Sequence, residues 1–327
     1  MTVADDLVVV TGGAGYIGSH LVRELLGAGA RVRVVDSLAV GTGSSLTSHW
    51  GHPRFEFLRG DVRESSLRDG ALTGATSVVH LAAVVGDPAC ARDQDLAREV
   101  NVDATRAWLD AARLAGGGRF LFASTCSNYG KMADPDAFAT EDWELRPVSL
   151  YAETKVAAEI DVLGAGEPGF STTCLRFATI YGTSPRMRFD LTVNEFTRDA
   201  VLSGALVVYG EQFWRPYVHV RDAARAIVMV LEAPPEAVAG EVFNVGDTGQ
   251  QFRKQDLVEL LVAKLPETTV ERVERTEDPR DYRVSFEKVK AALGFETTRT
   301  VPDGIDEMLE LLRSGAIQDP FSLEYRN

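Results

Sequence analysis

The chain has 327 residues, of which 45% are hydrophobic and 25% charged, and its formal net charge is −14 at pH 7. This composition predicts one dominant domain with a large core and a smaller dependent lobe, and the negative charge opposes nonspecific attraction to nucleic acid or anionic membranes. No run of eighteen uninterrupted apolar residues occurs and the first residues form no basic region, so we expect no membrane span, no signal peptide and a cytoplasmic location.

From the N-terminus to about residue 180, short β-branched runs alternate with amphipathic stretches. The apolar runs predict buried parallel strands at 7–12, 31–36, 55–61, 77–83, 119–125 and 172–177. The intervening spacing predicts helices that end in glycine at 16–29, 95–118 and 149–166. This α/β alternation predicts a Rossmann-type, doubly wound parallel sheet, with residues 1–180 as a dinucleotide-binding domain.

Beyond residue 180 the pattern becomes irregular, because proline, arginine and aromatic clusters separate the short elements. We expect strands at 205–210 and 241–246, and helices near 221–232, 253–264 and 303–313. Residues 181–327 are therefore expected to form a smaller α/β substrate-binding lobe, with some chain crossing back to the Rossmann sheet. No polar linker separates the two parts, so the lobe should pack directly on the sheet.

The first predicted strand runs into a glycine-rich turn, with Gly12, Gly15 and Gly18 spaced three apart before a helix. In that context glycines permit a tight turn and close approach to a pyrophosphate, which the helix N-terminus favours. Asp36 ends the second strand, where a carboxylate can accept hydrogen bonds from both adenosine ribose hydroxyls and repel a 2′-phosphate, which favours NAD over NADP. A simple capping role for Asp36 stays open. Asp61 ends the third strand. It is expected either to bind the adenine amino group or to be the N-cap of a helix beginning at Val62.

Tyr151 and Lys155 are four residues apart on a predicted helix, so their side chains share one face. A phenol near an ammonium and a positive nicotinamide ring can exchange a substrate hydroxyl proton while a hydride moves. An amphipathic helix with a snorkelling lysine is the alternative. Residues 122–130 favour catalysis, because they deliver hydroxyl groups to the carboxyl edge of the sheet, where ligands bind in this architecture.

These motifs together resemble the extended short-chain dehydrogenase/reductases, and within them the NAD-dependent nucleotide-sugar epimerases and dehydratases. The resemblance covers nearly the whole chain and includes TGGAGYIGSH, HLAA, the Y-x-x-x-K pair, LRFATIYG, RPYVHVRD and FNVGD. It implies a bound NAD, a nucleotide-diphosphate sugar as substrate, and a homodimer paired through helices near 93–114 and 150–164. It also implies that Thr125 assists the catalytic tyrosine, with Ser124 as a second candidate.

The resemblance extends to the remaining binding residues. Besides the glycines, aspartates and catalytic pair, it places around the cofactor Tyr16, Ile17, Ser37, Val62, Leu81, Ala82, Ala83, Asn101 and Phe177. Around the sugar nucleotide it places Val85, Cys126, Ser127, Thr179, Arg186, Arg188, Tyr209, Arg215, Arg280 and Arg283. Asp87 and Arg92 are expected to flank the nicotinamide or the sugar, unless Pro88 and Asp87 serve only to stabilise the loop.

Two departures from the family pattern bear on the reaction. Family dehydratases carry an acidic pair directly after the threonine, where this chain has Cys126 and Ser127. We interpret Cys126 as a small thiol that shapes the sugar pocket, in preference to a nucleophile, because no histidine partner is evident. Thr179 replaces the family's usual asparagine, so arginines must compensate as phosphate anchors, and Arg215 matches the family's diphosphate arginine.

We therefore expect epimerisation, at C4 of the sugar, by transient oxidation. A 4-ketoreductase, an atypical dehydratase and a noncatalytic NAD-sensing binding protein are the alternatives. No metal is expected, because His49 and His52 lack a ligand cluster, and His80 and His219 are expected to be core residues with one satisfied nitrogen. The three cysteines fit reduced thiols, with Cys90 and Cys174 as packing residues.

Overall fold

The computed structural model describes residues 2–132, 134, 136–274 and 280–327. Its largest element is a seven-stranded sheet in the order β10-β6-β5-β4-β1-β2-β3, in which each neighbouring pair is parallel. The strands are β1 (Leu7–Thr11), β2 (Arg31–Asp36), β3 (Phe55–Arg59), β4 (Ser77–His80), β5 (Arg119–Thr125), β6 (Ser171–Phe177) and β10 (Glu241–Val245). The predicted doubly wound fold is confirmed.

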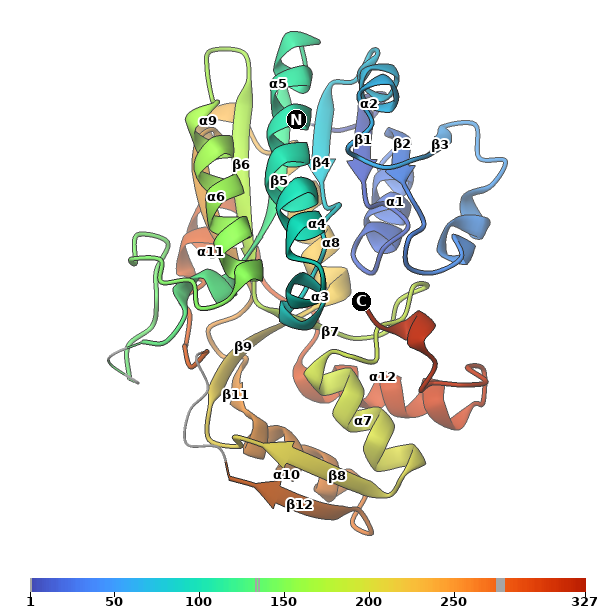
Figure 1. The fold of residues 1–327 in the computed structure, drawn as a ribbon, viewed down its shortest axis with the longest axis vertical. Coiled ribbons are helices and arrows are strands. Elements are labelled where there is room, and N and C mark those ends of the chain that lie inside the picture. Colours follow the sequence, from blue (N-terminus) through green and yellow to red (C-terminus); the bar gives the residue numbers. More distant parts are fainter. Residues whose placement is uncertain (1, 133, 135, 275–279) are drawn as a thin grey trace.

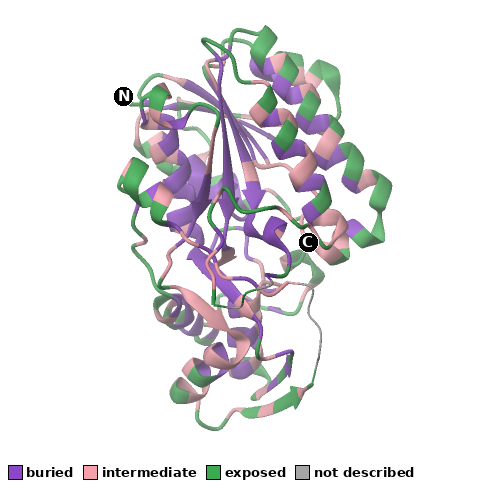
Figure 2. Ribbon diagram, turned by 90° about the vertical axis from the view of Figure 1, so that its left-hand side faces the viewer, coloured by how far each residue is buried: buried purple, intermediate pink, exposed green. Residues whose placement is uncertain are grey.

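Helices cover both faces of this sheet because its buried strands are apolar on both sides. In β1, Val8 and Val10 pack into one hydrophobic cluster and Val9 into another, as the alternation of a strand requires. The first cluster is closed by helices α1 (Gly18–Gly27), α8 (Val220–Glu232) and α11 (Glu287–Leu293). The second is closed by α2 (Ser65–Leu72), α5 (Thr105–Leu114) and α6 (Leu150–Gly164). Figure 2 shows the buried sheet between these layers.

The single helix expected over 95–118 is interrupted in the structure. After α3 (Asp87–Arg92), the chain forms α4 (Gln94–Arg98), then a π-helical turn over Glu99–Ala104, then α5. Asn101 lies in the π turn, and its amide bonds to Val84 and to Thr154 of α6. π-Helical turns recur at functional sites. Here the turn directs the polar side chain of Asn101 toward Val84 and Thr154, an orientation that apolar periodicity does not predict.

The second part of the chain forms a smaller lobe below the sheet (Figure 1). It contains a three-stranded sheet of β7 (Thr179–Tyr181), β9 (Trp214–His219) and β11 (Gln251–Arg253), and a pair of β8 (Ala205–Tyr209) with β12 (Thr269–Val273). Its helices α7 (Thr192–Leu202), α10 (Lys254–Lys264) and α12 (Val301–Arg313) close a third hydrophobic cluster.

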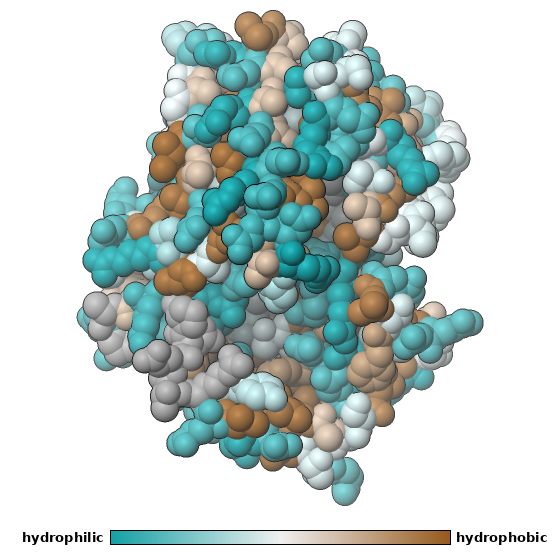
Figure 3. All heavy atoms as spheres, in the orientation of Figure 1, coloured by the Kyte–Doolittle hydropathy of each residue, from teal (hydrophilic) through white to brown (hydrophobic). Residues whose placement is uncertain are grey.

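The remaining short elements are the helical turns Ser44–His49, Cys126–Tyr129 and Leu323–Tyr325, and α9 (Pro235–Val238). The later sequence also supplies α8, β10 and α11 to the sheet layers, so the chain crosses back. In the space-filling view the surface is mostly hydrophilic and is hollowed between sheet and lobe (Figure 3). None of the helices in the described ranges is long and apolar enough to cross a membrane.

Candidate active site

The glycine-rich turn after β1 has no room for side chains. Gly12 has φ 71°, and a Cβ there would lie 2.8 Å from the backbone nitrogen of Ala82. A Cβ on Gly15 would lie 3.0 Å from the carbonyl oxygen of Gly12, and one on Gly18 would overlap the same oxygen. At these three glycines the turn packs backbone closely against backbone at the N-terminus of α1, and this cradle fits the pyrophosphate of a dinucleotide.

Asp36 lies at the end of β2 beside this turn. Its two carboxylate oxygens accept hydrogen bonds from the backbone nitrogens of Ala14 and Leu38, each at 2.9 Å. Burial raises the pKa of Asp36, and the two backbone bonds and the charge of Arg186 oppose that rise. Each oxygen keeps a second lone pair, so the carboxylate can still accept bonds from ribose hydroxyls. The neighbouring Ser37 is exposed.

Asp61, at the end of β3, is held by Arg63 rather than capping a helix. Its carboxylate accepts bonds from the backbone nitrogen of Arg63 and from the guanidinium of that residue, and this interaction lowers the pKa of Asp61. The helix begins at Ser65, with Glu64 as its N-cap. The alternative of an N-cap for a helix starting at Val62 is therefore wrong. Contact with adenine stays a prediction.

The expected cofactor residues after β4 lie together at the carboxyl edge of the sheet. Leu81, Ala82 and Ala83 follow β4 directly and are half-buried, and the backbone nitrogen of Ala82 bonds to the hydroxyl of Thr11 at 3.3 Å. Asn101 is buried and engages both backbone polar groups of Val84, at 2.8 and 2.9 Å. Asn101 thus fixes the loop that passes the cofactor cradle. Other expected cofactor residues are the buried Val62 and Phe177 and the half-buried Ile17.

Tyr16, within the glycine-rich turn, joins the cradle to the lower lobe. Its hydroxyl donates to the carbonyl oxygen of Gly182 at 2.5 Å and accepts a bond from the amide of Asn194 at 3.0 Å. Asn194 also accepts from the backbone nitrogen of Gly182. The predicted contribution of Tyr16 was to cofactor binding alone, and Asn194 was not identified from the sequence, because a buried asparagine in a helix carries no local signal of its distant partners.

The predicted catalytic residues come from two adjoining elements, the end of β5 and the first two turns of α6. Thr125 ends β5, and its hydroxyl accepts a bond from the backbone nitrogen of Ser127 at 3.1 Å. The ammonium of Lys155 is buried, donates to the carbonyl oxygen of Ala123 at 2.9 Å and lies 4.7 Å from the centre of the Phe122 ring. Tyr151 lies one turn earlier on α6. The hydroxyl of Thr125 and the ammonium of Lys155 are thus tied to the same end of β5.

Burial disfavours the charged forms of both Tyr151 and Lys155. It raises the pKa of Tyr151, while the charge of Arg188 opposes the rise. It lowers the pKa of Lys155 to about 8. A tyrosinate is therefore not formed by the protein alone, and a further positive charge is needed beside the phenol.

Ser124 points away from this group, into a buried polar network. Its hydroxyl donates to the carboxylate of Glu159 at 2.7 Å, and Glu159 forms a buried ion pair with Arg176 of β6. Arg176 also donates to the hydroxyl of Tyr129 at 2.9 Å. The assignment of Ser124 as a second catalytic hydroxyl is corrected accordingly, since its hydroxyl is committed to the network that joins β5, β6 and α6.

Cys126 also requires a correction. Its side chain is fully buried, its thiol donates to the carbonyl oxygen of Arg176 at 3.2 Å, and burial raises its pKa well above the usual value. A protonated thiol in the interior neither lines a sugar pocket nor acts as a nucleophile. Its neighbour Ser127 instead faces the lobe, with its hydroxyl 3.3 Å from that of Tyr282.

Two segments of the lobe, β9 and residues 280–282, bring cations and an aromatic ring to the predicted sugar side of the hollow. Arg215 of β9 is buried, and its guanidinium carbon lies 5.5 Å from the centre of the Tyr282 ring. Arg280 forms an ion pair with Asp87 at 3.0 Å, and Asp87 accepts a bond from Ser149, the N-cap of α6, at 2.7 Å. These contacts link the lobe to the catalytic helix. Tyr282 was not identified from the sequence, although its segment was.

The other expected substrate residues are more dispersed. Arg188 forms a bidentate ion pair with Asp190, at 3.0 and 2.7 Å. Its positive charge also acts on the phenol of Tyr151 and opposes the rise that burial causes in the pKa of that group. Arg283 stacks on Phe138 and Trp214. Of the others, Thr179 begins β7, Tyr209 is exposed at the end of β8, Val85 is half-buried before α3, and Arg92 is exposed on α3.

Arg186 does not lie with the sugar-side arginines. Its guanidinium donates to the carbonyl oxygens of Met187 and Arg326 and to the side chain of Asn327, each at 2.9 Å. It also lies beside Gly41, and its charge acts on Asp36. This is the predicted adenosine end of the cleft, so its assignment as an anchor for the substrate diphosphate is corrected.

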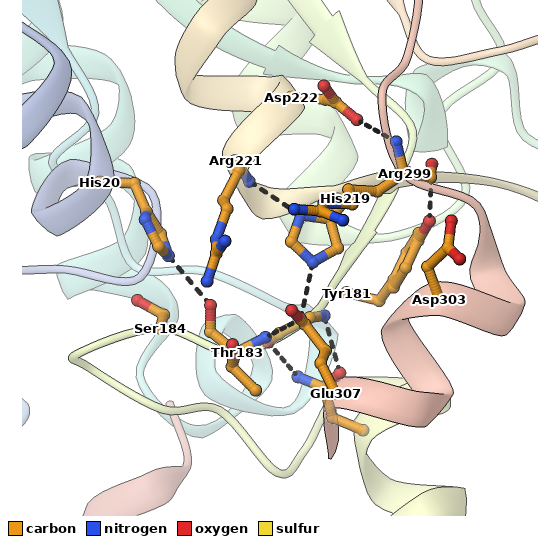
Figure 4. A network of polar contacts seen from close by, with 12 residues as sticks. His20, Tyr181, Thr183, Ser184, His219, Arg221, Asp222, Arg299, Asp303 and Glu307 are labelled. Atoms are coloured by element: carbon orange, nitrogen blue, oxygen red, sulfur yellow. Dashed lines mark hydrogen bonds and ion pairs between the residues drawn. The ribbon is translucent and has the colours of Figure 1, made fainter. Parts of the chain in front are cut away.

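Both strand histidines are core residues, and each has two partners rather than one. His80 lies 3.0 Å from the hydroxyl of Thr11 and 3.1 Å from that of Thr105, and burial lowers its pKa to about 3. His219 lies 2.7 Å from Glu307 and accepts a bond from the backbone nitrogen of Arg221 (Figure 4). Within the described part of the chain, no group of three His, Cys, Asp or Glu side chains is placed to hold a metal ion.

Comparison with known proteins identifies relatives along most of the chain. A model of the NAD-dependent epimerase/dehydratase family matches residues 8–246. A dTDP-glucose 4,6-dehydratase from Streptomyces griseus is 32% identical, over 91% of this chain and 91% of its own. A UDP-glucose 4-epimerase from Mycolicibacterium smegmatis is 30% identical, over 94% and 98%. The solved structure of MoeE5 in complex with UDP-glucuronic acid and NAD is 29% identical, with a TM-score of 0.81, over 94% and 99%.

Proposed function

The chain belongs to the NAD-dependent epimerase/dehydratase family, and we propose that it is an epimerase that inverts C4 of a nucleotide-diphosphate sugar through a transient 4-keto intermediate. Its cofactor is NAD, and the turn at Gly12, Gly15 and Gly18 fits it because this backbone packs too closely for side chains and brings its amides to the N-terminus of α1. When bound, NAD supplies reversible hydride acceptance. Elimination of water would require a further acid and base.

The observation that carries the proposal is that the two residues directly after Thr125, Cys126 and Ser127, are not acidic. The buried, protonated thiol of Cys126 and the hydroxyl of Ser127 stand where family dehydratases carry an acidic pair. Neither group can serve as a carboxylic acid and its conjugate base near neutral pH. Epimerisation does not need them, since, besides the reversible hydride acceptance that NAD would supply, it requires only proton exchange at one hydroxyl and rotation of the keto sugar.

The chain's own residues account for that proton exchange. Tyr151 takes the proton of the C4 hydroxyl and later returns it, and Thr125 holds the same oxygen with its hydroxyl. One donor of Lys155 is used by the carbonyl oxygen of Ala123, which leaves two for the nicotinamide ribose and for stabilising the phenolate. Arg215 holds the diphosphate, and the pair of Arg280 with Asp87 closes the lobe on the catalytic helix.

The proposal is tested by following isotopes. The cofactor released by denaturing the purified protein is identified, and the native protein is incubated with UDP- and dTDP-hexoses in deuterated water. The expected result is a C4 epimer whose C4 hydrogen has not exchanged, with no consumption of added cofactor.

Three other outcomes would overturn the proposal. Deuterium at C6 with loss of water identifies a dehydratase, and stoichiometric oxidation of added NADH identifies a 4-ketoreductase. Bound NAD without turnover across the panel identifies a noncatalytic NAD-sensing protein.

A further inference from the structure

A cavity of about 360 Å³ lies where α1, residues 183–187 and α12 meet, and the cofactor and sugar sites described above do not account for it. Arg23 and Arg221 supply its charged wall, and Met187, Leu311 and Tyr325 supply an apolar wall. Its volume lies at the lower end of the range of small-ligand pockets.

Arg221 is the unusual residue of this cavity. It stands in the first turn of α8, where its backbone nitrogen bonds to His219 at 3.2 Å. Its Nε is buried, and among the described residues it has no hydrogen-bond partner. Figure 4 shows the side chain extending between His20 and Glu307 toward Thr183. A buried donor without a partner is unfavourable, and a bound acceptor would satisfy it.

The charged groups that line the cavity favour an anion. Its lining contains no carboxylate, and burial lowers the pKa of His20 to about 4, so that this histidine is neutral. The positive charge comes from Arg221 and from Arg23, which is exposed and lies 3.4 Å from Glu24. An adjoining cavity of about 520 Å³ shares Arg221 but carries Asp303, Glu307 and Glu310. These acids would repel an extended polyanion, which confines a ligand to one compact anionic group.

We propose that the cavity is a second ligand site, which binds a phosphate group carried by a small phosphomonoester or present as free inorganic phosphate. Arginine guanidinium groups match phosphate oxygens in geometry and charge. The apolar wall at Met187, Leu311 and Tyr325 suits the organic part of a phosphomonoester, which therefore binds more tightly than inorganic phosphate.

This site is connected to the cofactor cradle through two residues, Thr183 and Ser184. The hydroxyl of Ser184 donates to the carbonyl oxygen of Tyr16 at 2.9 Å. It also lies 3.0 Å from the hydroxyl of Ser19. His20 bonds to the carbonyl oxygen of Thr183 at 2.9 Å. A phosphate held against this turn by Arg221 acts on the loop that binds NAD, and by linkage each ligand changes the affinity of the other.

The binding test uses protein saturated with NAD, titrated with inorganic phosphate and separately with glucose 1-phosphate, with calorimetry as the readout. Saturable binding of both, tighter for glucose 1-phosphate, is expected. R221M and R23M should each weaken it at least tenfold. The matched control is R272Q, which removes an arginine from the exposed pair with Glu211 and should leave this binding unchanged. R215M removes the proposed diphosphate arginine and reports any phosphate bound in the sugar cleft instead.

The proposal is overturned if phosphate does not bind, or if R221M and R23M bind it as the unchanged protein does. Loss of binding in R215M alone would place the phosphate in the sugar cleft and would overturn it equally. These measurements need no turnover, so failure of the epimerase assignment would not affect them.

The linkage is tested by measuring the Kd for NAD with and without 10 mM glucose 1-phosphate. We expect at least a threefold change in the unchanged protein and none in R221M. Competition at the glycine cradle would weaken NAD equally in both proteins, and that outcome would overturn the coupling.

Discussion

The two ends of the proposed cleft are built in different ways. The pyrophosphate turn at the cofactor end is built from one contiguous stretch, β1 to α1, and presents backbone groups and glycines with little or no space for a Cβ. The sugar end is assembled from separate segments, and presents Arg215, Arg280 and Tyr282 on loops and strands of the lobe. Because of this difference, we expect the cofactor end to be sensitive to added side-chain volume and the sugar end to be sensitive to lost positive charge.

The largest effect is expected at Tyr151, which stands between the two ends. Tyr151→Phe removes the hydroxyl that exchanges the proton, so kcat should fall about 10²–10⁴-fold, the usual contribution of general acid-base catalysis. Binding of NAD and of the nucleotide sugar should change little, because the ring remains. Turnover is measured on the substrate found in the panel, and NAD affinity by fluorescence titration.

Phenylalanine at this position also tests the comparison itself. If Y151F lost NAD binding and turnover together, the phenol would belong to the cofactor end. Unchanged turnover would remove Tyr151 from the chemistry altogether.

The next largest effect is expected from added volume at the cofactor end. Gly18→Ala places a Cβ against the backbone of Gly12 and Gly13, which no side-chain movement can relieve. We expect NAD affinity to fall about 10²-fold, with a loss of about 1–3 kcal/mol in the free energy of unfolding. Calorimetric titration with NAD and urea denaturation measure the two quantities.

Gly27→Ala, near the end of the same helix, is the matched control. Nothing lies within 4 Å of its added Cβ, so the change should leave NAD affinity unaltered and raise the free energy of unfolding by about 0.4–1 kcal/mol. Equal losses in both variants would show that the helix, rather than the cradle, responds to the change.

The same comparison explains what the sequence could predict. The strands, the helices and the glycine-rich turn follow from local periodicity and spacing, since that turn lies within one contiguous stretch of chain. The π turn at Asn101 was not predicted, because its cause is a set of bonds to Val84 and Thr154, far away in the chain.

At the sugar end, residue type alone did not separate ligand-binding arginines from structural ones. Arg186 and Arg215 have the same side chain in similar polar segments, yet Arg186 donates to the C-terminal residues Arg326 and Asn327. Arg215 instead donates to the carbonyl oxygen of its neighbour Trp214 and faces the Tyr282 ring. Ser124 and Thr125 are adjacent in the sequence, but alternation along β5 turns Ser124 toward Glu159. Such choices depend on tertiary partners that a local pattern does not contain.

A smaller effect is expected from lost charge at the sugar end. Arg215→Met keeps much of the side-chain volume but removes the guanidinium proposed to hold the diphosphate. A hydrogen bond to a charged group is worth about 1.5–3 kcal/mol, so KM should rise about 10- to 100-fold, with kcat nearly unchanged. Initial-rate measurements separate the two constants. A fall in kcat at constant KM would instead assign Arg215 to the reacting centre. Arg272→Gln, which removes a positive charge from the exposed pair with Glu211, is the control for net charge.

The smallest effect concerns the buried ammonium of Lys155, whose pKa falls from 10.5 to about 8 in the folded chain. That displacement corresponds to about 3 kcal/mol of destabilisation when the group is charged. Lys155→Met relieves it but loses the bond to Ala123, worth about 1 kcal/mol. At pH 7 the cofactor-free variant should therefore be more stable by about 1–2 kcal/mol, although inactive.

The pH dependence gives this prediction its sign. Between pH 8 and 10.5 the unfolded chain binds more protons at Lys155 than the folded chain does, so the unfolding free energy of the unchanged protein rises with pH through this window. The Lys155→Met variant lacks that rise, so its advantage should shrink by about 1–2 kcal/mol at pH 9.5. Urea denaturation of both proteins at pH 7 and pH 9.5 gives the double difference, in which the other titrating groups cancel. A constant difference between the two pH values would mean that the ammonium is not desolvated, and that the bond to Ala123 stabilises the folded chain.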